Sequence, residues 1–182
     1  MSRVSRVEQI PTALQPLFGQ FQERFENQAL ALAHSAPVFQ HVYGLVQDLR
    51  DEGLLPQKLV EIAVVATSAA NRCKYCVDHH APVLKGMGLL PQTVDRILEP
   101  DVPGLDARER LVRDYAVLVT ERPWGIRDVV FDELRRHFDD REIVELTARI
   151  ALCGLFNRIN YALQIKLEPG IIIEADSPHQ LR

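Results

Sequence analysis

The chain has 182 residues, which is the length of one ordinary domain and enough to bury a core. Its composition, 47% hydrophobic and 25% charged, is that of a soluble globular protein. The net charge of −4 excludes the basic footprint of a nucleic-acid binder, and no apolar run approaches the roughly 18 residues of a membrane helix. Three cysteines cannot form a disulfide scaffold, and the N-terminus lacks a signal-peptide core, so we expect a cytoplasmic protein.

Apolar residues repeat with a helical period from the start of the chain. The first helix is expected to begin at Pro16 and to continue through Phe25. A second helix is expected to open near Ser35 and to close before Gly53. Two similar stretches follow, Gly53-Leu54-Leu55-Pro56-Gln57 and Gly88-Leu89-Leu90-Pro91-Gln92. Each predicts a helix that stops at glycine, followed by a helix with proline in its first turn.

The second half of the chain predicts three more helices. One follows Asp106 and ends by Pro123, and a short one opens at Asp128. The last follows Asp139 and Glu142, which have the spacing of a capping box. Strand-like alternation is confined to residues 170–174, which is too short for a sheet, so the predicted class is all-α.

The domain organisation is expected to be simple. An N-terminal arm of residues 1–14 precedes one helical domain of residues 15–168, and a tail of residues 169–182 follows. The apolar run Ile171–Ile173 is expected to pack on the domain or on a neighbouring subunit.

A helix that is apolar nearly all round is predicted over residues 59–70, and it should therefore be central and buried. Glu61 is the single charge within it. A buried carboxylate must find a proton or a hydrogen-bond donor. The simplest interpretation is an ion pair with a nearby arginine, for which the candidates are Arg72, Arg149 and Arg158.

Cys73, Cys76 and His80 follow this helix. A turn of about 100° per residue places all three on one face if they share a helix. Cys76 and His80 are then neighbours, and the imidazole can take the thiol proton and hold a reactive thiolate. Cys73 can close a disulfide onto Cys76 with little backbone change. A dithiol with a base beside it can reduce a peroxide or exchange disulfides.

Glu61 can join these residues only if the helix breaks before Cys73. On one unbroken helix, 12 residues would separate the two by about 18 Å. The polar residues Ser68 and Asn71 favour helix ends over helix interiors, so a break is predicted near Asn71. Cys73 would then lie at a helix N-terminus, where the dipole favours a thiolate.

The pattern of Glu61, Cys73, Cys76 and His80 resembles the active-site motif of the alkylhydroperoxidase AhpD-like proteins, which belong to the carboxymuconolactone decarboxylase family. The residues around this motif, 72–81, and a later segment, residues 156–163, also resemble the sequences of that family. The resemblance covers roughly residues 15–168. It is closer to the peroxidase-related branch than to the decarboxylases, which generally lack the two cysteines. The resemblance implies an AhpD-like helical bundle that assembles as a homo-oligomer, whether dimer, trimer or hexamer.

The resemblance also implies a mechanism without a cofactor. Cys76 attacks the peroxide and becomes a sulfenic acid, which Cys73 resolves to a disulfide. His80 and Glu61 relay the proton, and Tyr75, between the cysteines, is implied as a further member of the relay. The implied partners are a peroxide and a thiol or dithiol reductant, such as a thioredoxin-like or lipoyl-carrying protein. Helix-dipole reasoning alone would favour Cys73 as the nucleophile, whereas the spacing to His80 favours Cys76.

Two alternatives use the same residues. One is a non-enzymatic helical oligomer whose cysteines only sense oxidant. The other is a structural zinc site made by Cys73, Cys76, His79 and His80, although two adjacent histidines point about 100° apart on a helix.

Several other residues have a simpler interpretation. Cys153 is expected to be a small buried core residue, and Trp124 to be a loop aromatic that plugs an edge of the core. His79 is expected to be exposed or to support the site. Residues Asn157, Arg158 and Asn160 either support the thiol site or pack at the helix end or against a subunit.

Overall fold

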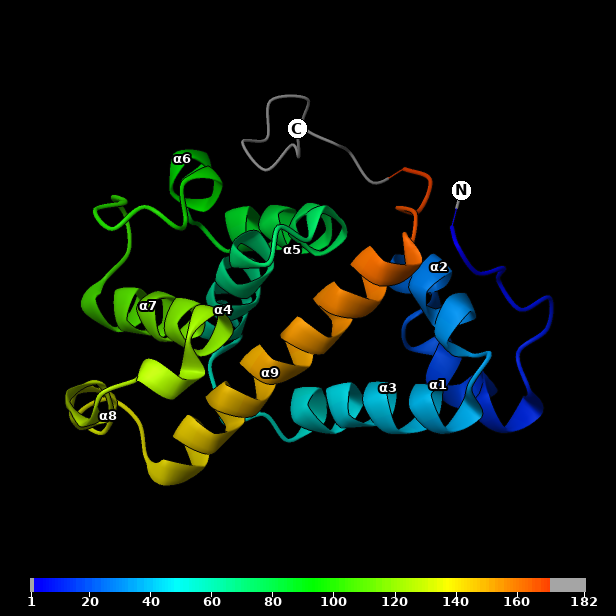
Figure 1. Ribbon diagram of the computed structural model, residues 1–182, viewed down its shortest axis with the longest axis horizontal. Coiled ribbons are helices and arrows are strands. Elements are labelled where there is room, and N and C mark those ends of the chain that lie inside the picture. Colours follow the sequence, from blue (N-terminus) through cyan, green and yellow to red (C-terminus); the bar gives the residue numbers. More distant parts are fainter. Residues whose placement is uncertain (1, 171–182) are drawn as a thin grey trace. The chain divides into compact units, whose positions relative to one another are not determined.

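The computed structural model describes residues 2–170 of the chain (Figure 1). Within this range there are nine α-helices, two short 3₁₀ helices and no strand, so the predicted all-α class is confirmed. The apolar run Ile171–Ile173 and most of the predicted tail lie outside the described residues. No described helix is both long enough and apolar enough to span a membrane.

The described residues group into two compact units. Those up to Gly53 and those from Ile159 onward form the first unit, and Leu54–Arg158 form the second. The last helix, α9 (Asp140–Leu163), contributes residues to both. The domain boundaries expected after residues 14 and 168 stay a prediction.

The first unit begins with three short elements and one long helix: η1 (Thr12–Leu14), α1 (Gln15–Gly19), α2 (Gln22–Leu32) and α3 (Ala36–Asp51). The single helix expected from Pro16 to Phe25 is therefore divided. Phe21 lies between α1 and α2 because its ring is buried against Tyr43 on α3, with ring centroids 4.6 Å apart. Here tertiary packing of an aromatic ring outweighs helix continuity. The predicted second helix is confirmed, since α3 follows Ser35 and ends before Gly53.

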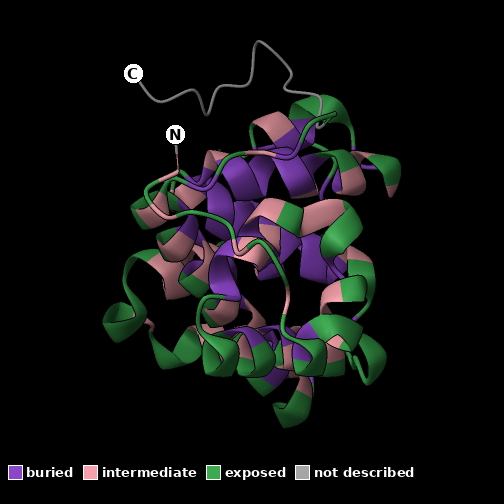
Figure 2. Cartoon of the chain, turned by 90° about the vertical axis from the view of Figure 1, so that its right-hand side faces the viewer, coloured by how far each residue is buried: buried purple, intermediate pink, exposed green. Residues whose placement is uncertain are grey.

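The second unit is built around one buried helix. Its elements are α4 (Gln57–Ala70), α5 (Lys74–Gly86), α6 (Pro91–Asp95), α7 (Ala107–Glu121), η2 (Pro123–Gly125), α8 (Asp128–Leu134) and the first part of α9. Ten of the fourteen residues of α4 are buried, as predicted for a helix that is apolar nearly all round. This helix packs against both α5 and α7 (Figure 1), and Figure 2 marks buried residues in purple. Helix α4 is therefore the central helix of this unit, and α5 packs directly against it.

Local capping rules account for several helix starts. Asp106 and Glu109 form a reciprocal capping box at the start of α7. Asp139 and Glu142 do the same before α9: each side chain accepts from the other residue's backbone N–H, at 2.9 and 2.8 Å. Both predicted starts are confirmed.

The prediction for Trp124 is wrong. Its side chain is 85% exposed, on the short turn η2, and it does not plug the core. Ile126 and Phe131, which follow it in the sequence, pack against the core instead. Phe131 meets Tyr115 edge-on, with ring centroids 6.0 Å apart. The aromatic contact expected of the loop is thus made by the next helix.

Candidate active site

The break predicted near Asn71 is present. Helix α4 ends at Ala70, and Arg72 adopts a left-handed conformation with φ +56°. The backbone N–H of Cys73 donates to the Ser68 carbonyl at 2.8 Å, and that of Arg72 donates to the Ala69 carbonyl at 2.9 Å. These two hydrogen bonds define a Schellman motif. The residue that completes the motif, Cys73, is also the N-cap of α5.

The two candidate redox cysteines are neighbours. Cys73 and Cys76 are both buried free thiols, with their Sγ atoms 3.1 Å apart. Cys73 is the N-cap and Cys76 lies within the first turn of α5, so the helix dipole acts on both sulfurs. The dipole therefore discriminates less between the two cysteines than the sequence argument assumed.

Glu61 is bound by a histidine. Its Oε2 lies 2.8 Å from His80 Nδ1, and its Oε1 accepts from Gln57 Nε2 at 2.9 Å. The side chain is buried, as predicted. Sequence reasoning missed Gln57, although its spacing of four residues before Glu61 on a helix was a usable signal.

Two of the arginines considered as partners of Glu61 make other contacts. Arg149 Nε donates to Glu145 at 2.7 Å, and Arg158 Nη1 donates to the Gly154 carbonyl at 2.9 Å. A hydrogen bond from a ring nitrogen to a carboxylate fixes the orientation of the ring. The buried carboxylate of Glu61 therefore has His80 and Gln57 as hydrogen-bond partners.

Helix α5 connects the two pairs. Cys76 and His80 lie one turn apart on this helix, so they share a face and their side chains are neighbours. Cys76 and His80, one from each pair, therefore lie along one side of α5. Glu61, Cys73, Cys76 and His80 come from two helices that the break near Asn71 folds together.

Tyr75 and His79 lie on another face of α5. Their rings are 4.4 Å apart between centroids, at an angle of 51°, and both residues are buried. Of the two alternatives for His79, exposure is excluded because the residue is buried and its ring packs against Tyr75, and the supporting role stays a prediction. The participation of Tyr75 in a proton relay stays a prediction.

Cys153 is buried, as predicted, but its surroundings are polar. Its Sγ lies 3.3 Å from Ser68 Oγ and 3.8 Å from Asn157 Oδ1. Burial raises the pKa of its thiol from 9.0 to about 12, because the thiolate would lose its solvation. Electrostatic interactions with Cys73 and Glu61 raise this pKa further. Cys153 is therefore a neutral thiol at physiological pH.

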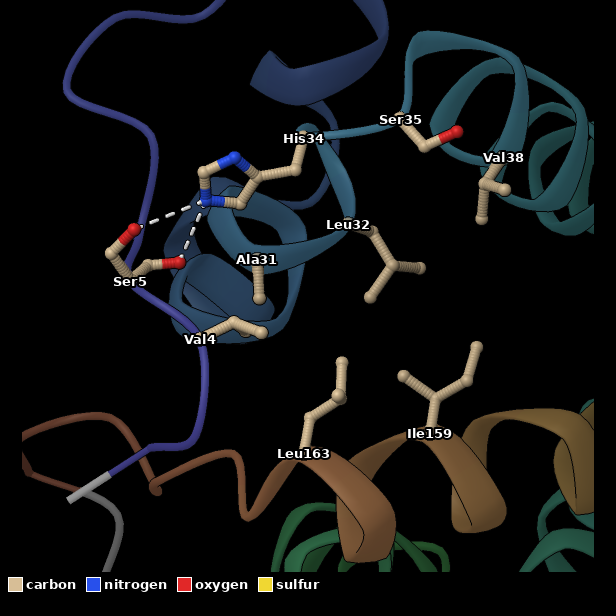
Figure 3. A pocket seen from close by; sticks show the side chains of 9 residues that line it. All are labelled: Val4, Ser5, Ala31, Leu32, His34, Ser35, Val38, Ile159 and Leu163. Carbon is tan, nitrogen blue, oxygen red and sulfur yellow. Dashed lines mark hydrogen bonds between the residues drawn. The ribbon is translucent and has the colours of Figure 1, made fainter.

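A separate cavity of about 470 Å³ lies in the first unit (Figure 3). The cavity is lined by apolar side chains that include Leu32, Val38, Ile159 and Leu163. His34 and Ser5 also line it, and His34 Nε2 donates to the Ser5 carbonyl at 2.9 Å. None of the predicted site residues lines it. Across residues 2–170, no three His, Cys, Asp or Glu side chains are grouped so that they could hold a metal ion.

The chain is similar to known proteins in sequence and in fold. Residues 36–103, which include all five predicted site residues, match the model of the carboxymuconolactone decarboxylase family. A solved structure described as an alkylhydroperoxidase AhpD core, an uncharacterized peroxidase-related protein from Ralstonia eutropha JMP134, is 27% identical, with a TM-score of 0.80. The match covers 93% of this chain and 94% of that one. The chain is thus similar to the carboxymuconolactone decarboxylase family over residues 36–103 and has the fold of the AhpD-like proteins.

Other relatives of this AhpD-like chain are more distant or partial. The uncharacterized protein YnjA of Escherichia coli (strain K12) is 31% identical over 99 residues, which is 51% of this chain and 52% of that protein. The chain thus matches about half the length of that relative. The debrominase Bmp8, solved with 2,3,4-tribromopyrrole, is 21% identical, covers 94% of this chain and 96% of its own, and has a TM-score of 0.79. At that identity the likeness shows the AhpD-like fold alone, and one fold can host several chemistries.

Proposed function

We propose that the chain is a thiol-dependent peroxidase that reduces hydroperoxides through a Cys73–Cys76 dithiol/disulfide cycle. The observation that carries the proposal is the pair of free sulfurs 3.1 Å apart on the helix that also holds His80 against Glu61. A nucleophile, a second thiol to trap its oxidised form and an oriented base are the groups that such a cycle needs.

The hydrogen bond to Glu61 determines what His80 can do. Its Nδ1–H donates to the carboxylate, which leaves Nε2 as the basic nitrogen. Nε2 takes the proton of the Cys76 thiol, one helical turn away, and the buried Glu61 carboxylate stabilises the resulting imidazolium. Because the dipole of α5 acts on both sulfurs, proximity to His80 selects Cys76 as the nucleophile.

The oxidation step is balanced within this set of groups. The Cys76 thiolate attacks one oxygen of the peroxide O–O bond and becomes a sulfenic acid. The other oxygen leaves as an alcohol, or as water from hydrogen peroxide, with the proton held by His80.

The resolving step forms the disulfide. The Cys73 sulfur attacks the sulfenic sulfur of Cys76 and the hydroxyl group leaves as water, which forms the Cys73–Cys76 bond. The two sulfurs already lie 3.1 Å apart, so a small movement suffices. An external dithiol, on a thioredoxin-like or lipoyl-carrying protein, then returns both thiols. That partner, the homo-oligomeric state and the cytoplasmic location remain predictions.

Steady-state reduction of hydrogen peroxide and of an organic hydroperoxide by the purified protein, with dithiothreitol as reductant, tests the proposal. Cys76→Ser should abolish turnover. Cys73→Ser should still undergo the first oxidation and give a sulfenic acid that dimedone traps. Cys153→Ser is the control, and it should keep full turnover because Cys153 takes no part in the cycle and a serine hydroxyl can keep the contact with Ser68 Oγ.

The outcomes separate the alternatives. If Cys76→Ser keeps turnover, the assignment of the nucleophile is wrong. If the protein consumes only one equivalent of peroxide while dithiothreitol is in excess, it is a sensor that reacts once and not a peroxidase. Stopped-flow measurement with excess peroxide distinguishes the two.

A further inference from the structure

The turn that places Cys73 is conformationally demanding. Arg72 has φ +56°, in the left-handed region that side chains other than glycine rarely adopt, and its side chain is exposed. Its position is the one that glycine usually takes in a Schellman motif. Other groups must therefore hold the turn in place.

Asn157 supplies such groups from α9. Its Oδ1 accepts from Asn71 Nδ2 at 2.9 Å, and its own Nδ2 donates to Ser68 Oγ at 3.2 Å. Asn71 is the C-cap of α4, and the Ser68 carbonyl receives the backbone N–H of Cys73. One side-chain amide, only 2% exposed, thus joins Ser68 and Asn71 in the last turn of α4, from which the Arg72 turn leaves.

Two residues close to Asn157 on α9, Cys153 and Gly154, also lie against the end of α4. Cys153, one helical turn before Asn157, brings its Sγ to 3.3 Å from Ser68 Oγ. Gly154 leaves room: a Cβ there would lie 2.9 Å from Arg158 Nη1 and 3.9 Å from Asn71 Nδ2. Cys153, Gly154 and Asn157 therefore form one face of α9 shaped to the end of α4.

We propose that Asn157 is a positioning residue for the redox pair, holding the Arg72 turn so that the Cys73 thiol stays within reach of Cys76. The inference rests on the proposed function, because it assigns Asn157 to the resolving step of that cycle. A loosened turn lowers the effective concentration of the Cys73 thiol at Cys76, and the disulfide then forms less readily.

The equilibrium between the dithiol and oxidised glutathione tests this directly. In that reaction, the Cys73 and Cys76 thiols are oxidised to a disulfide while one oxidised glutathione is reduced to two thiols. Asn157→Ala should lower the equilibrium constant about tenfold, which is roughly 30 mV in reduction potential. Asn160→Ala is the matched control: Asn160 lies on the same helix, is 3% exposed and accepts from Gln28 Nε2 at 2.7 Å. It should leave the constant unchanged, even where it lowers thermal stability.

A rescue separates positioning from general damage. Glycine adopts the left-handed conformation readily, so Arg72→Gly added to Asn157→Ala should restore most of the equilibrium constant. Arg72→Gly alone should leave it near the parent value. If Asn157→Ala does not fold, Ser68→Ala, which removes the hydrogen bond that Asn157 Nδ2 donates, should show an intermediate fall of about threefold.

Each result decides the matter. An unchanged constant in Asn157→Ala, or an equal fall in Asn160→Ala, overturns the positioning role while the proposed function stands. A double variant that is no better than Asn157→Ala also overturns it. If the parent protein forms no Cys73–Cys76 disulfide at any glutathione ratio, the proposed function fails and the positioning role fails with it.

Discussion

The two ends of α5 are joined to their neighbours by the same backbone turn, held in different ways. At the start, Arg72 is left-handed and Cys73 bonds to the Ser68 carbonyl. At the end, Gly88 has φ +93°, and Leu89 N–H reaches the Leu84 carbonyl at 3.4 Å. Both are Schellman motifs, but only the second has the glycine that this motif favours.

The difference between the two turns shows which residues fix the position of Cys73. A Cβ built on Gly88 would meet nothing within 4 Å, so that turn depends on the conformational freedom of glycine alone. The Arg72 turn depends on the buried amide of Asn157, from a helix far along the chain. A surface turn can tolerate small movements, whereas two thiols that must react need a fixed separation.

The largest expected effect lies at the Glu61–His80 pair, which joins α4 to the middle of α5. Glu61→Gln removes the charge that orients His80 and stabilises its protonated form, so kcat/KM for peroxide should fall about a hundredfold. The hydrogen bond from Gln57 to the side-chain oxygen can persist, and the fold should survive. Stopped-flow oxidation of the reduced protein measures the effect directly.

Glu145→Gln is the matched control for that change. Glu145 is also a buried carboxylate of the second unit, and it accepts from the backbone N–H of Leu54 at 3.0 Å and from Arg149 Nε at 2.7 Å. Its neutralisation should lower the free energy of unfolding and leave peroxide turnover intact. Equal losses of turnover in the two variants would mean that Glu61 acts through stability alone.

A second test concerns the buried thiol of Cys153, which contacts Ser68 in the last turn of α4. The folded protein raises the pKa of Cys153 from 9.0 to about 12, so this group stabilises the fold below pH 9 and loses that contribution as the pH rises toward 12. Near pH 10.5 the thiol is ionised in the unfolded chain only, which weakens the fold by about 2 kcal/mol.

Urea unfolding at about pH 7 and pH 10.5 checks this sign. Cys153→Ala leaves a small cavity at both pH values but has no thiol to ionise, so it should lose less stability than the parent over that interval. Parallel losses in the two proteins would show that Cys153 ionises as readily in the fold as in the unfolded chain.

The third expected effect is a smaller loss of stability, at the Gly88 turn. Gly88→Ala forces a side chain into a left-handed conformation and should lower the free energy of unfolding by about 1 kcal/mol. Because the Gly88 turn holds no reacting group, the glutathione equilibrium of the Cys73–Cys76 pair should stay unchanged. A shift of that equilibrium would show that strain travels along α5, and the contrast between its two ends would disappear.

Local rules predicted much of this molecule from the sequence. The capping box of Asp139 and Glu142, the glycine stop at Gly88 and the break near Asn71 each depend on residues adjacent in the chain. The spacing that puts Cys76 and His80 on one face of a helix is also local, and the break near Asn71 lets Glu61 reach His80.

Long-range packing accounts for what sequence reasoning missed. Burial of Phe21 against Tyr43 divides the expected first helix, and Phe131 takes the core contact expected of Trp124. Asn157 was placed only as a residue that supports the thiol site or packs at a helix end. Its hydrogen bonds span 86 and 89 residues of chain, and no local pattern encodes such pairs.

The smallest expected effect is a gain in the free energy of unfolding, opposite in sign to the effect of Gly88→Ala. Arg72→Gly removes the strain of a left-handed arginine, but it also gives the unfolded chain more freedom, so the net gain should be about 0.5 kcal/mol. The arginine side chain is exposed, so its removal should leave the core unchanged. Arg72→Ala, which keeps the strain, serves as the control and should be no more stable than the parent in urea unfolding. A loss of stability in Arg72→Gly would mean that the arginine side chain itself holds the turn, and Asn157 would then share that role.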